Sequence, residues 1–103
     1  MYRVRSLIKV TFEGWPSAID NAARINELAE RRGWRPQTIW TQTFGPFNEL
    51  AFEREYPDLA TYERETAAFY ADKEVMQLVA EGAQHRRGEG FGHNEIWERV
   101  NTD

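Results

Sequence analysis

Histidine is the residue type best suited to proton transfer near neutral pH, and one of the two in this chain lies in a pattern that suits chemistry. His93, Glu95 and Trp97 are spaced by two, so on a strand their side chains share one face. A histidine beside a carboxylate and an aromatic ring can act as a general base or a haem ligand. The competing interpretation is a histidine at a strand edge or dimer seam, satisfied by a carboxylate. His85 stands near an expected helix end, where we expect it to be exposed.

Three carboxylates form a second candidate group. Glu49, Glu53 and Glu55 are separated by even numbers of residues, so alternation places them on one face of a strand. Neighbouring carboxylates can raise one pKa enough for acid–base catalysis. The other interpretation is that these acids are solvated on an edge strand or meet Arg5 and Lys9 on a neighbouring strand. The sequence favours this second interpretation.

Several kinds of site are excluded or disfavoured. The chain has no cysteine, which excludes disulfides, thiolate nucleophiles and cysteine metal sites. A metal site built from His85 and His93 lacks a carboxylate at a metal-motif spacing, so we expect no metal. A Ser-His-acid triad would need Ser6 or Ser17, and Ser17 suits a helix cap. The sequence also lacks a phosphate-binding loop and a glycine-rich dinucleotide motif, so we expect no cofactor.

The bulk composition predicts one globular domain. The 103 residues are 41% hydrophobic and 29% charged, which suits a single domain at 1–103 with its own core. The net charge of −4 and the pI near 5.2 argue against nucleic-acid binding. No stretch reaches the ~20 apolar residues of a membrane span, and the first residues lack the apolar region of a signal peptide. We therefore expect a cytoplasmic protein with no nucleic-acid or membrane partner.

Hydrophobic periodicity predicts the elements that position these residues. Alternation and enrichment in β-formers predict strands over residues 2–12, 37–43, 48–56 and 91–100. Helical spacing predicts a helix over 17–32 and a second that opens at Pro57-Asp58, breaks near 70–72 and continues over 73–83. The first helix has Ser17 as its expected N-cap and Gly33 as its expected C-cap. The first strand is expected to turn one face inward, with Tyr2, Val4, Ile8, Val10 and Phe12.

This order matches a ferredoxin-like βαββαβ subunit, an α+β fold with a four-stranded antiparallel sheet and its helices on one face. Such a sheet leaves its second face to solvent or to a partner. Trp97 is a large side chain to leave in water on that face. A second copy laid sheet against sheet would cover it, so we expect a homodimer. The second face is mixed in character, with Arg5, Leu7, Lys9, His93 and Trp97.

Three motifs resemble those of a known family. They are residues 40–50 (WTQTFGPFNEL), residues 55–60 (EYPDLA) followed by Glu63, and residues 94–98 (NEIWE). Together they resemble the NIPSNAP-like branch of the dimeric α+β barrel superfamily, whose element order matches nearly the whole chain. The resemblance implies a dimer whose two sheets form a barrel, and a small-molecule cleft between sheet and helices. The superfamily includes cofactor-independent monooxygenases, haem-degrading enzymes, lactone isomerases and stress-induced proteins. This branch offers no catalytic motif to carry over, so the catalytic residues stay unknown.

Aromatic residues make up 14% of the chain and suggest what such a cleft would bind. Rings can line a cleft for a flat apolar ligand, or they can fill the core and the dimer seam. We expect binding or conversion of a small hydrophobic or aromatic molecule. Two alternatives stay open: a non-catalytic protein-interaction module, and a cofactor-independent monooxygenase or haem-related enzyme. The candidate cleft residues are Trp40, Asn48, Arg54, Tyr62, Phe69, Tyr70, His93 and Trp97.

Overall fold

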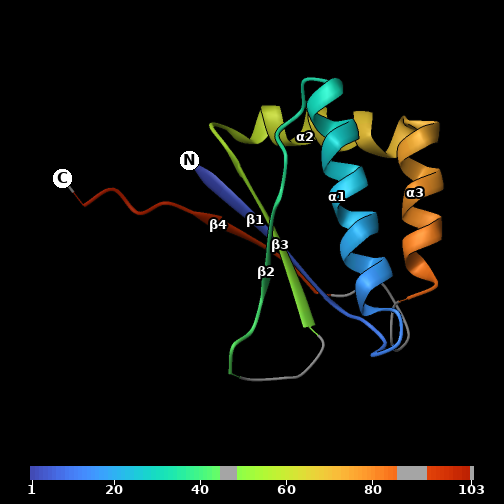
Figure 1. Ribbon diagram of the computed structural model, residues 1–103. Coiled ribbons are helices and arrows are strands. Elements are labelled where there is room, and N and C mark those ends of the chain that lie inside the picture. The colour runs from blue at the N-terminus through green and yellow to red at the C-terminus, as the bar shows by residue number, and fades with distance from the viewer. Residues whose placement is uncertain (45–48, 86–92, 103) are drawn as a thin grey trace.

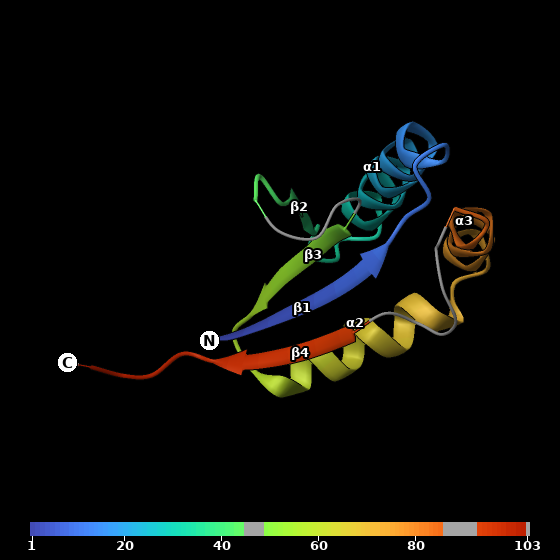
Figure 2. The ribbon, with the colours of Figure 1, turned by 90° about the horizontal axis from the view of Figure 1, so that it is seen from below.

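The computed structural model describes residues 1–44, 49–85 and 93–102 of the chain. Its elements are β1 (Tyr2–Lys9), α1 (Trp15–Arg31), β2 (Thr38–Thr41), β3 (Glu49–Tyr56), α2 (Leu59–Ala71), α3 (Lys73–Ala83) and β4 (His93–Glu98). The strands form one antiparallel sheet in the order β2-β3-β1-β4, with α1, α2 and α3 on the same side of it (Figure 1, Figure 2). The predicted ferredoxin-like α+β fold is confirmed. No helix in these ranges is long and apolar enough to cross a membrane.

The strands are shorter than periodicity predicted. β1 ends at Lys9 rather than at residue 12, because the chain turns at residues 12–14. Phe12, which was expected on the buried face, is consequently 72% exposed, whereas Val10 is completely buried. Residues 45–48 and 91–92, which the strand predictions included in part, lie outside the described residues.

The pairing of β1 with both of its neighbours determines which side chains lie on each face of the sheet. β1 pairs with β3 on one side and with β4 on the other, and alternate side chains of each strand point to opposite faces. The face toward the helices, here the helix face, carries Val4, Ser6, Ile8, Phe52, Arg54, Tyr56, Asn94 and Ile96. The opposite face, here the outer face, carries Arg3, Arg5, Leu7, Trp40, Glu53, Glu55, His93, Glu95 and Trp97.

α1 starts two residues earlier than predicted. Its first residue is Trp15, its N-cap is Gly14, and Pro16 occupies the first turn. Proline suits this position because its ring presets the backbone and its missing N–H would have had no helical partner. The N–H of Gly14 donates to the Thr11 hydroxyl at 3.1 Å. The predicted Ser17 cap is therefore wrong, since Ser17 lies inside the first turn.

At the end of α1 the C-cap is Arg32, and Gly33, which was predicted as the C-cap, follows it directly. Gly33 has a φ of +76°, a left-handed conformation that glycine adopts without a steric penalty. Its N–H donates to the Glu30 carbonyl at 3.0 Å, and the N–H of Trp34 donates to the Ala29 carbonyl at 2.9 Å. This turn brings the Trp34 ring to 6.3 Å from the Phe69 ring of α2.

The second helical segment breaks at Asp72, as predicted. Asp72 lies between α2 and α3 with an extended backbone. Its carboxylate accepts a hydrogen bond from the Val75 N–H at 3.1 Å, which caps α3, and it pairs with Arg32 Nε at 2.8 Å. Arg32 also pairs with Glu74 at 3.1 Å. These ion pairs fasten the end of α1 to the junction of α2 and α3.

Most of the core lies between the sheet and the α1–α3 pair, whereas the buried Tyr56 lies beneath α2. α1 and α3 run side by side, whereas α2 lies across one end of the sheet (Figure 1). Among the residues of α2, all of which the structure describes, none is buried. α2 therefore lies over the sheet but leaves a space between itself and the strands. The buried hydrophobic side chains are Val10, Ala18, Ala22, Ile25, Leu28, Ala29, Leu50, Tyr56 and Val75.

Asp72→Asn is expected to flatten the acid dependence of stability. Hydrogen bonds from Arg32 and from the Val75 N–H hold the pKa of Asp72 below its usual value of 3.8. Folding therefore favours the ionised form, and its contribution is present above about pH 4 and lost as the pH falls through the folded-state pKa. Asparagine keeps an acceptor for Val75, so the variant removes chiefly the charge that Arg32 binds.

Thermal unfolding between about pH 7 and pH 2 measures this contribution. We expect Asp72→Asn to melt below the wild type at neutral pH and to approach it in acid. Glu63→Gln, a charge removal at an exposed position of the same helix pair, serves as the control. Equal melting temperatures of wild type and Asp72→Asn at neutral pH would contradict the stabilising role of Asp72.

Candidate functional site

A cleft lies between α2 and the helix face of the sheet. Its volume is about 250 Å³ beneath α2, and an adjoining part of about 470 Å³ extends toward α1 and α3. Both parts are bounded by Phe52, Arg54 and Phe69, among others, so we treat them as one site, the helix-face cleft. The part beneath α2 is lined by Val4, Ser6, Trp34, Arg35, Gln37, Phe52, Arg54, Tyr56, Tyr62, Glu65, Thr66, Phe69, Tyr70, Asn94 and Ile96.

The structure brings together four of the eight residues that the sequence suggested for such a cleft. Arg54 enters from β3, and Tyr62, Phe69 and Tyr70 enter from α2. Asn48 lies outside the described residues. These four residues belong to segments that are adjacent in sequence and meet because α2 folds back over β3.

Trp40, His93 and Trp97 lie on the outer face and do not line the helix-face cleft. In the register of the sheet, Trp97 stands opposite Arg3. Because the period of a strand is two, its neighbour Ile96 lines the cleft while Trp97 points away from it. The prediction that these three residues line a cleft together with Arg54 is therefore wrong.

Aromatic rings form much of the cleft wall. α2 turns Tyr62, Thr66 and Phe69 toward the sheet at the spacing of a helix stripe. The Tyr62 ring meets the Tyr56 ring of β3 edge-on, with centroids 5.4 Å apart. The Phe69 ring lies 6.3 Å from Trp34. Offset and edge-on pairs such as these stabilise aromatic clusters beyond simple area burial.

Sequence reasoning missed Trp34 and Tyr56 as cleft residues. Tyr56 is two residues from the cleft candidate Arg54, so strand alternation puts both on one face and could have indicated Tyr56. Trp34 carries no such signal, because its position depends on the left-handed turn at Gly33.

Arg54 is a largely buried cation among these aromatic rings. Its guanidinium carbon lies 5.3 Å from the centroid of the Phe69 ring, within cation–π range. Its Nε is buried and has no hydrogen-bond partner among the described residues. Burial lowers the pKa of Arg54, an effect that Tyr56 and Glu65 oppose. A guanidinium nevertheless remains protonated in proteins, so the cleft contains a positive charge.

Tyr56, Glu65 and Tyr70 are ionisable groups that act on Arg54. The Glu65 carboxylate accepts a hydrogen bond from the backbone N–H of Arg35 at 2.8 Å and lies 3.9 Å from Arg35 Nε. Burial raises the pKa of Tyr56, and Arg54 opposes that shift. The Tyr56 hydroxyl therefore stays protonated at neutral pH.

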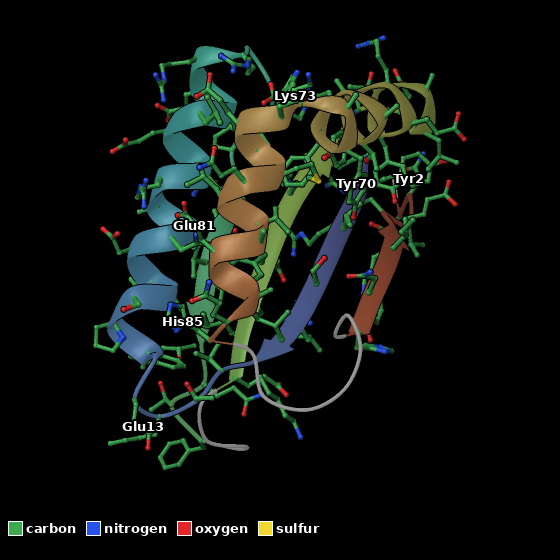
Figure 3. All side chains as sticks on the ribbon, turned by 90° about the vertical axis from the view of Figure 1, so that its right-hand side faces the viewer. Tyr2, Glu13, Tyr70, Lys73, Glu81 and His85 are labelled. Carbon is green, nitrogen blue, oxygen red and sulfur yellow. The ribbon has the colours of Figure 1, made fainter. Side chains whose placement is uncertain are left out.

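The cleft opens beside β4. Ser6 of β1 and Asn94 of β4 stand opposite each other on the helix face and supply polar groups. Tyr70 is 66% exposed and Ile96 is 51% exposed, which marks the opening. Figure 3 shows Tyr70 between α2 and the strands β1 and β4. The arrangement offers a molecule from solvent an apolar space with a buried cation and a few hydrogen-bonding groups.

The acids of β3 are paired with arginines on the outer face. Arg5 Nη2 lies 2.5 Å from Glu53, and Arg3 Nη2 lies 2.5 Å from Glu55. This confirms that acids of β3 meet basic residues of the neighbouring strand, with Arg5 as expected and Arg3 in place of Lys9. The expectation of an edge strand is wrong, because β3 lies between β2 and β1.

His93 also has a carboxylate partner. Its Nε2 lies 3.0 Å from Glu95, and Trp97 Nε1 donates to the same carboxylate at 3.0 Å. Hydrogen bonds from His93 and Trp97 hold the pKa of Glu95 below its usual value. The structure thus matches a strand-edge histidine satisfied by a carboxylate.

His85 follows α3 and is half-buried rather than exposed as expected. Its carbonyl accepts a hydrogen bond from the Thr11 N–H at 2.8 Å, and its ring packs so closely on Gly14 that an added Cβ there would lie 2.7 Å from Nδ1. In the part of the chain that the structure describes, no three His, Asp or Glu side chains are grouped to hold a metal ion.

The fold recurs in solved structures of low sequence identity. One is described as an antibiotic biosynthesis monooxygenase, with a TM-score of 0.75, 17% identity, and coverage of 98% of this chain and 100% of the other. An uncharacterized NIPSNAP domain protein from Burkholderia xenovorans gives 0.78 and 15%, covering 100% and 98%. A NIPSNAP family protein from Agrobacterium tumefaciens gives 0.78 and 10%, covering 98% and 94%. At these identities the likeness establishes the fold alone. No curated protein sequence matches the chain.

A family model identifies the chain more closely than these structural likenesses do. The NIPSNAP model matches residues 11–88, a span that contains α1, β2, β3, α2 and α3 and therefore most of the cleft wall. The match covers well over half of the chain and agrees with the motifs at residues 40–50 and 55–60. The chain belongs to the NIPSNAP family.

Proposed function

We propose that this protein binds a small, flat, largely apolar molecule in the helix-face cleft. The observation that carries the proposal is the space beneath α2. No residue of this fully described helix is buried, and the cleft that it covers is lined by six aromatic side chains, Trp34, Phe52, Tyr56, Tyr62, Phe69 and Tyr70.

A ligand in this position would complete the packing that the chain alone leaves open. Small-molecule sites are typically concave and apolar, with a few polar groups that fix orientation, and the helix-face cleft has this composition. Covering about 100 Å² of apolar surface would contribute ~2.5 kcal/mol at the usual ~25 cal/mol per Å². The volume beneath α2 suits a molecule of one or two rings.

We further propose that two copies pair through their outer faces. Trp40 and Trp97 lie on strands at opposite edges of the sheet and are 57% and 56% exposed. Between them, Arg3 and Arg5 are already paired with glutamates of the same chain, so covering them leaves no lone charge. A two-fold pairing of outer faces would remove both indole rings from water and leave the helix-face clefts outside the interface.

A second candidate function is oxygenation of the bound molecule. It is favoured by the fold that this chain shares with a structure described as an antibiotic biosynthesis monooxygenase. Oxygen uptake in the presence of a ligand found in the experiment below separates the two functions, since binding alone consumes no oxygen. For either function we propose that the protein is cytoplasmic, as expected from the sequence.

Ligand binding is expected to raise the melting temperature. A ligand at 100 times its Kd adds ~2.7 kcal/mol to the free energy of unfolding, which corresponds to roughly 10–20 °C for a domain of this size. We would screen indole, 2-naphthol, 2-naphthoate, biphenyl carboxylates and haem by thermal unfolding. At least one of these compounds should stabilise the protein.

Two tryptophan substitutions on α2 locate the binding. Thr66 lines the cleft, whereas Ala67 is exposed to solvent. Thr66→Trp should fill the cleft and abolish the thermal shift, and Ala67→Trp should preserve it. The proposal fails if no compound stabilises the wild type, or if Thr66→Trp responds as the wild type does.

The pairing of outer faces predicts the mass in solution. Light scattering at micromolar concentration should give about twice the chain mass of 12.1 kDa. Trp40→Glu combined with Trp97→Glu should give a monomer, because two carboxylates would have to be buried without partners. Leu59→Glu, at a 43% exposed position of α2, should leave the dimer intact. A wild-type monomer at every concentration would rule the pairing out.

A further inference from the structure

Arg54 differs from the other arginines of the sheet in having no acidic partner. On the outer face, Arg3 and Arg5 each lie 2.5 Å from a glutamate. Across residues 1–44, 49–85 and 93–102, no carboxylate lies within 4.0 Å of the Arg54 guanidinium, and its buried Nε makes no hydrogen bond.

The acid that shares the cleft with Arg54 is used elsewhere. Glu65 accepts the Arg35 N–H at 2.8 Å, and its second oxygen lies 3.9 Å from Arg35 Nε. Its side chain is only 12% exposed, so it is fixed in this role rather than free to swing across the cleft. Glu65 therefore lowers the potential around Arg54 without pairing with it.

A largely buried guanidinium without an acidic partner is costly, because the charge loses hydration and gains no opposite charge. The Phe69 ring, at 5.3 Å, and the Tyr56 hydroxyl compensate for this loss only in part. A methionine or leucine at the same position would fill the space without that cost. The presence of arginine makes sense when a second, anionic group enters the cleft from outside.

We propose that the ligand of the helix-face cleft is a ring carboxylate whose acid group pairs with Arg54. The inference rests on the proposed function, and it adds the chemical class of the ligand. The planar guanidinium offers parallel N–H donors that match the two oxygens of a carboxylate. The ring system lies against Phe69 and Phe52, and Ser6 and Asn94 on the floor offer further hydrogen bonds.

The test compares ring acids with their neutral amides. Benzoate, 2-naphthoate and indole-3-acetate are each titrated against the protein by calorimetry, together with the corresponding amide of the same shape. In the wild type, the best-binding acid should bind at least tenfold more tightly than its amide. In Arg54→Met the two should bind within about twofold of each other, because only the charged partner has been removed.

Matched variants separate a charge effect from a folding effect. Arg54→Met should melt at or above the wild-type temperature in the absence of ligand, since it removes a lone buried charge. Arg5→Met should melt lower, because it deprives the half-buried Glu53 of its partner, yet it should bind ring acids as the wild type does. If Arg54→Met does not fold, Arg54→Lys supplies the comparison: it should keep a preference for the acid but bind it more weakly, because the parallel donors are gone.

The outcomes distinguish this inference from the proposed function. Equal binding of acid and amide to the wild type, or undiminished preference for the acid in Arg54→Met, would overturn the pairing with Arg54 and leave the cleft as a binding site for neutral rings. Failure of all three acids to bind would overturn the inference. Failure of the whole compound screen would overturn the proposed function as well.

Discussion

The central position of β1 governs what each side of this protein can do. β1 pairs with both β3 and β4, so the side chains of all three strands alternate in step. Of two consecutive residues on any of these strands, one side chain therefore faces the cleft and the other faces the opposite surface. β3 illustrates this within three residues. Glu53 and Glu55 point outward and meet arginines of β1, whereas Arg54 between them points inward and meets aromatic rings. Arginine therefore makes a surface ion pair on one face of the sheet, whereas on the other it is largely buried with no acidic partner among the described residues.

The space around Arg54 exists because of how α2 is held. Its N-terminus is capped by Asp58, which accepts the Thr61 N–H at 2.7 Å, and its other end meets α3 at Asp72. Asp72 is in turn bound to Arg32 at the end of α1. α2 is thus held at its two ends and by contacts of its aromatic rings, such as that of Tyr62 with Tyr56. Because none of its side chains is buried against the strands, a cleft remains between α2 and the sheet.

The element order and the break at Asp72 could be predicted from periodicity and capping residues. The alternation that placed Glu53 and Glu55 on one face of their strand also separates Arg54 from them, as the structure does. The capping prediction failed at Ser17, because α1 starts before it with Pro16 in the first turn. Alternation assigned His93 and Trp97 to the second face of the sheet, which the register confirms. Their inclusion among the cleft residues was wrong, because the cleft lies on the other face. Trp34 joined the cleft through a turn whose geometry no pattern reveals.

These features support one account, in which an aromatic cleft beneath α2 holds a ring and Arg54 holds its acid group. A crystal structure of the protein soaked with 2-naphthoate tests it most directly. The account predicts electron density for the ring between Phe69 and the helix face, with both carboxylate oxygens within hydrogen-bond distance of the Arg54 guanidinium. A naphthoate bound on the outer face, or one in the cleft with its carboxylate turned away from Arg54, would contradict it.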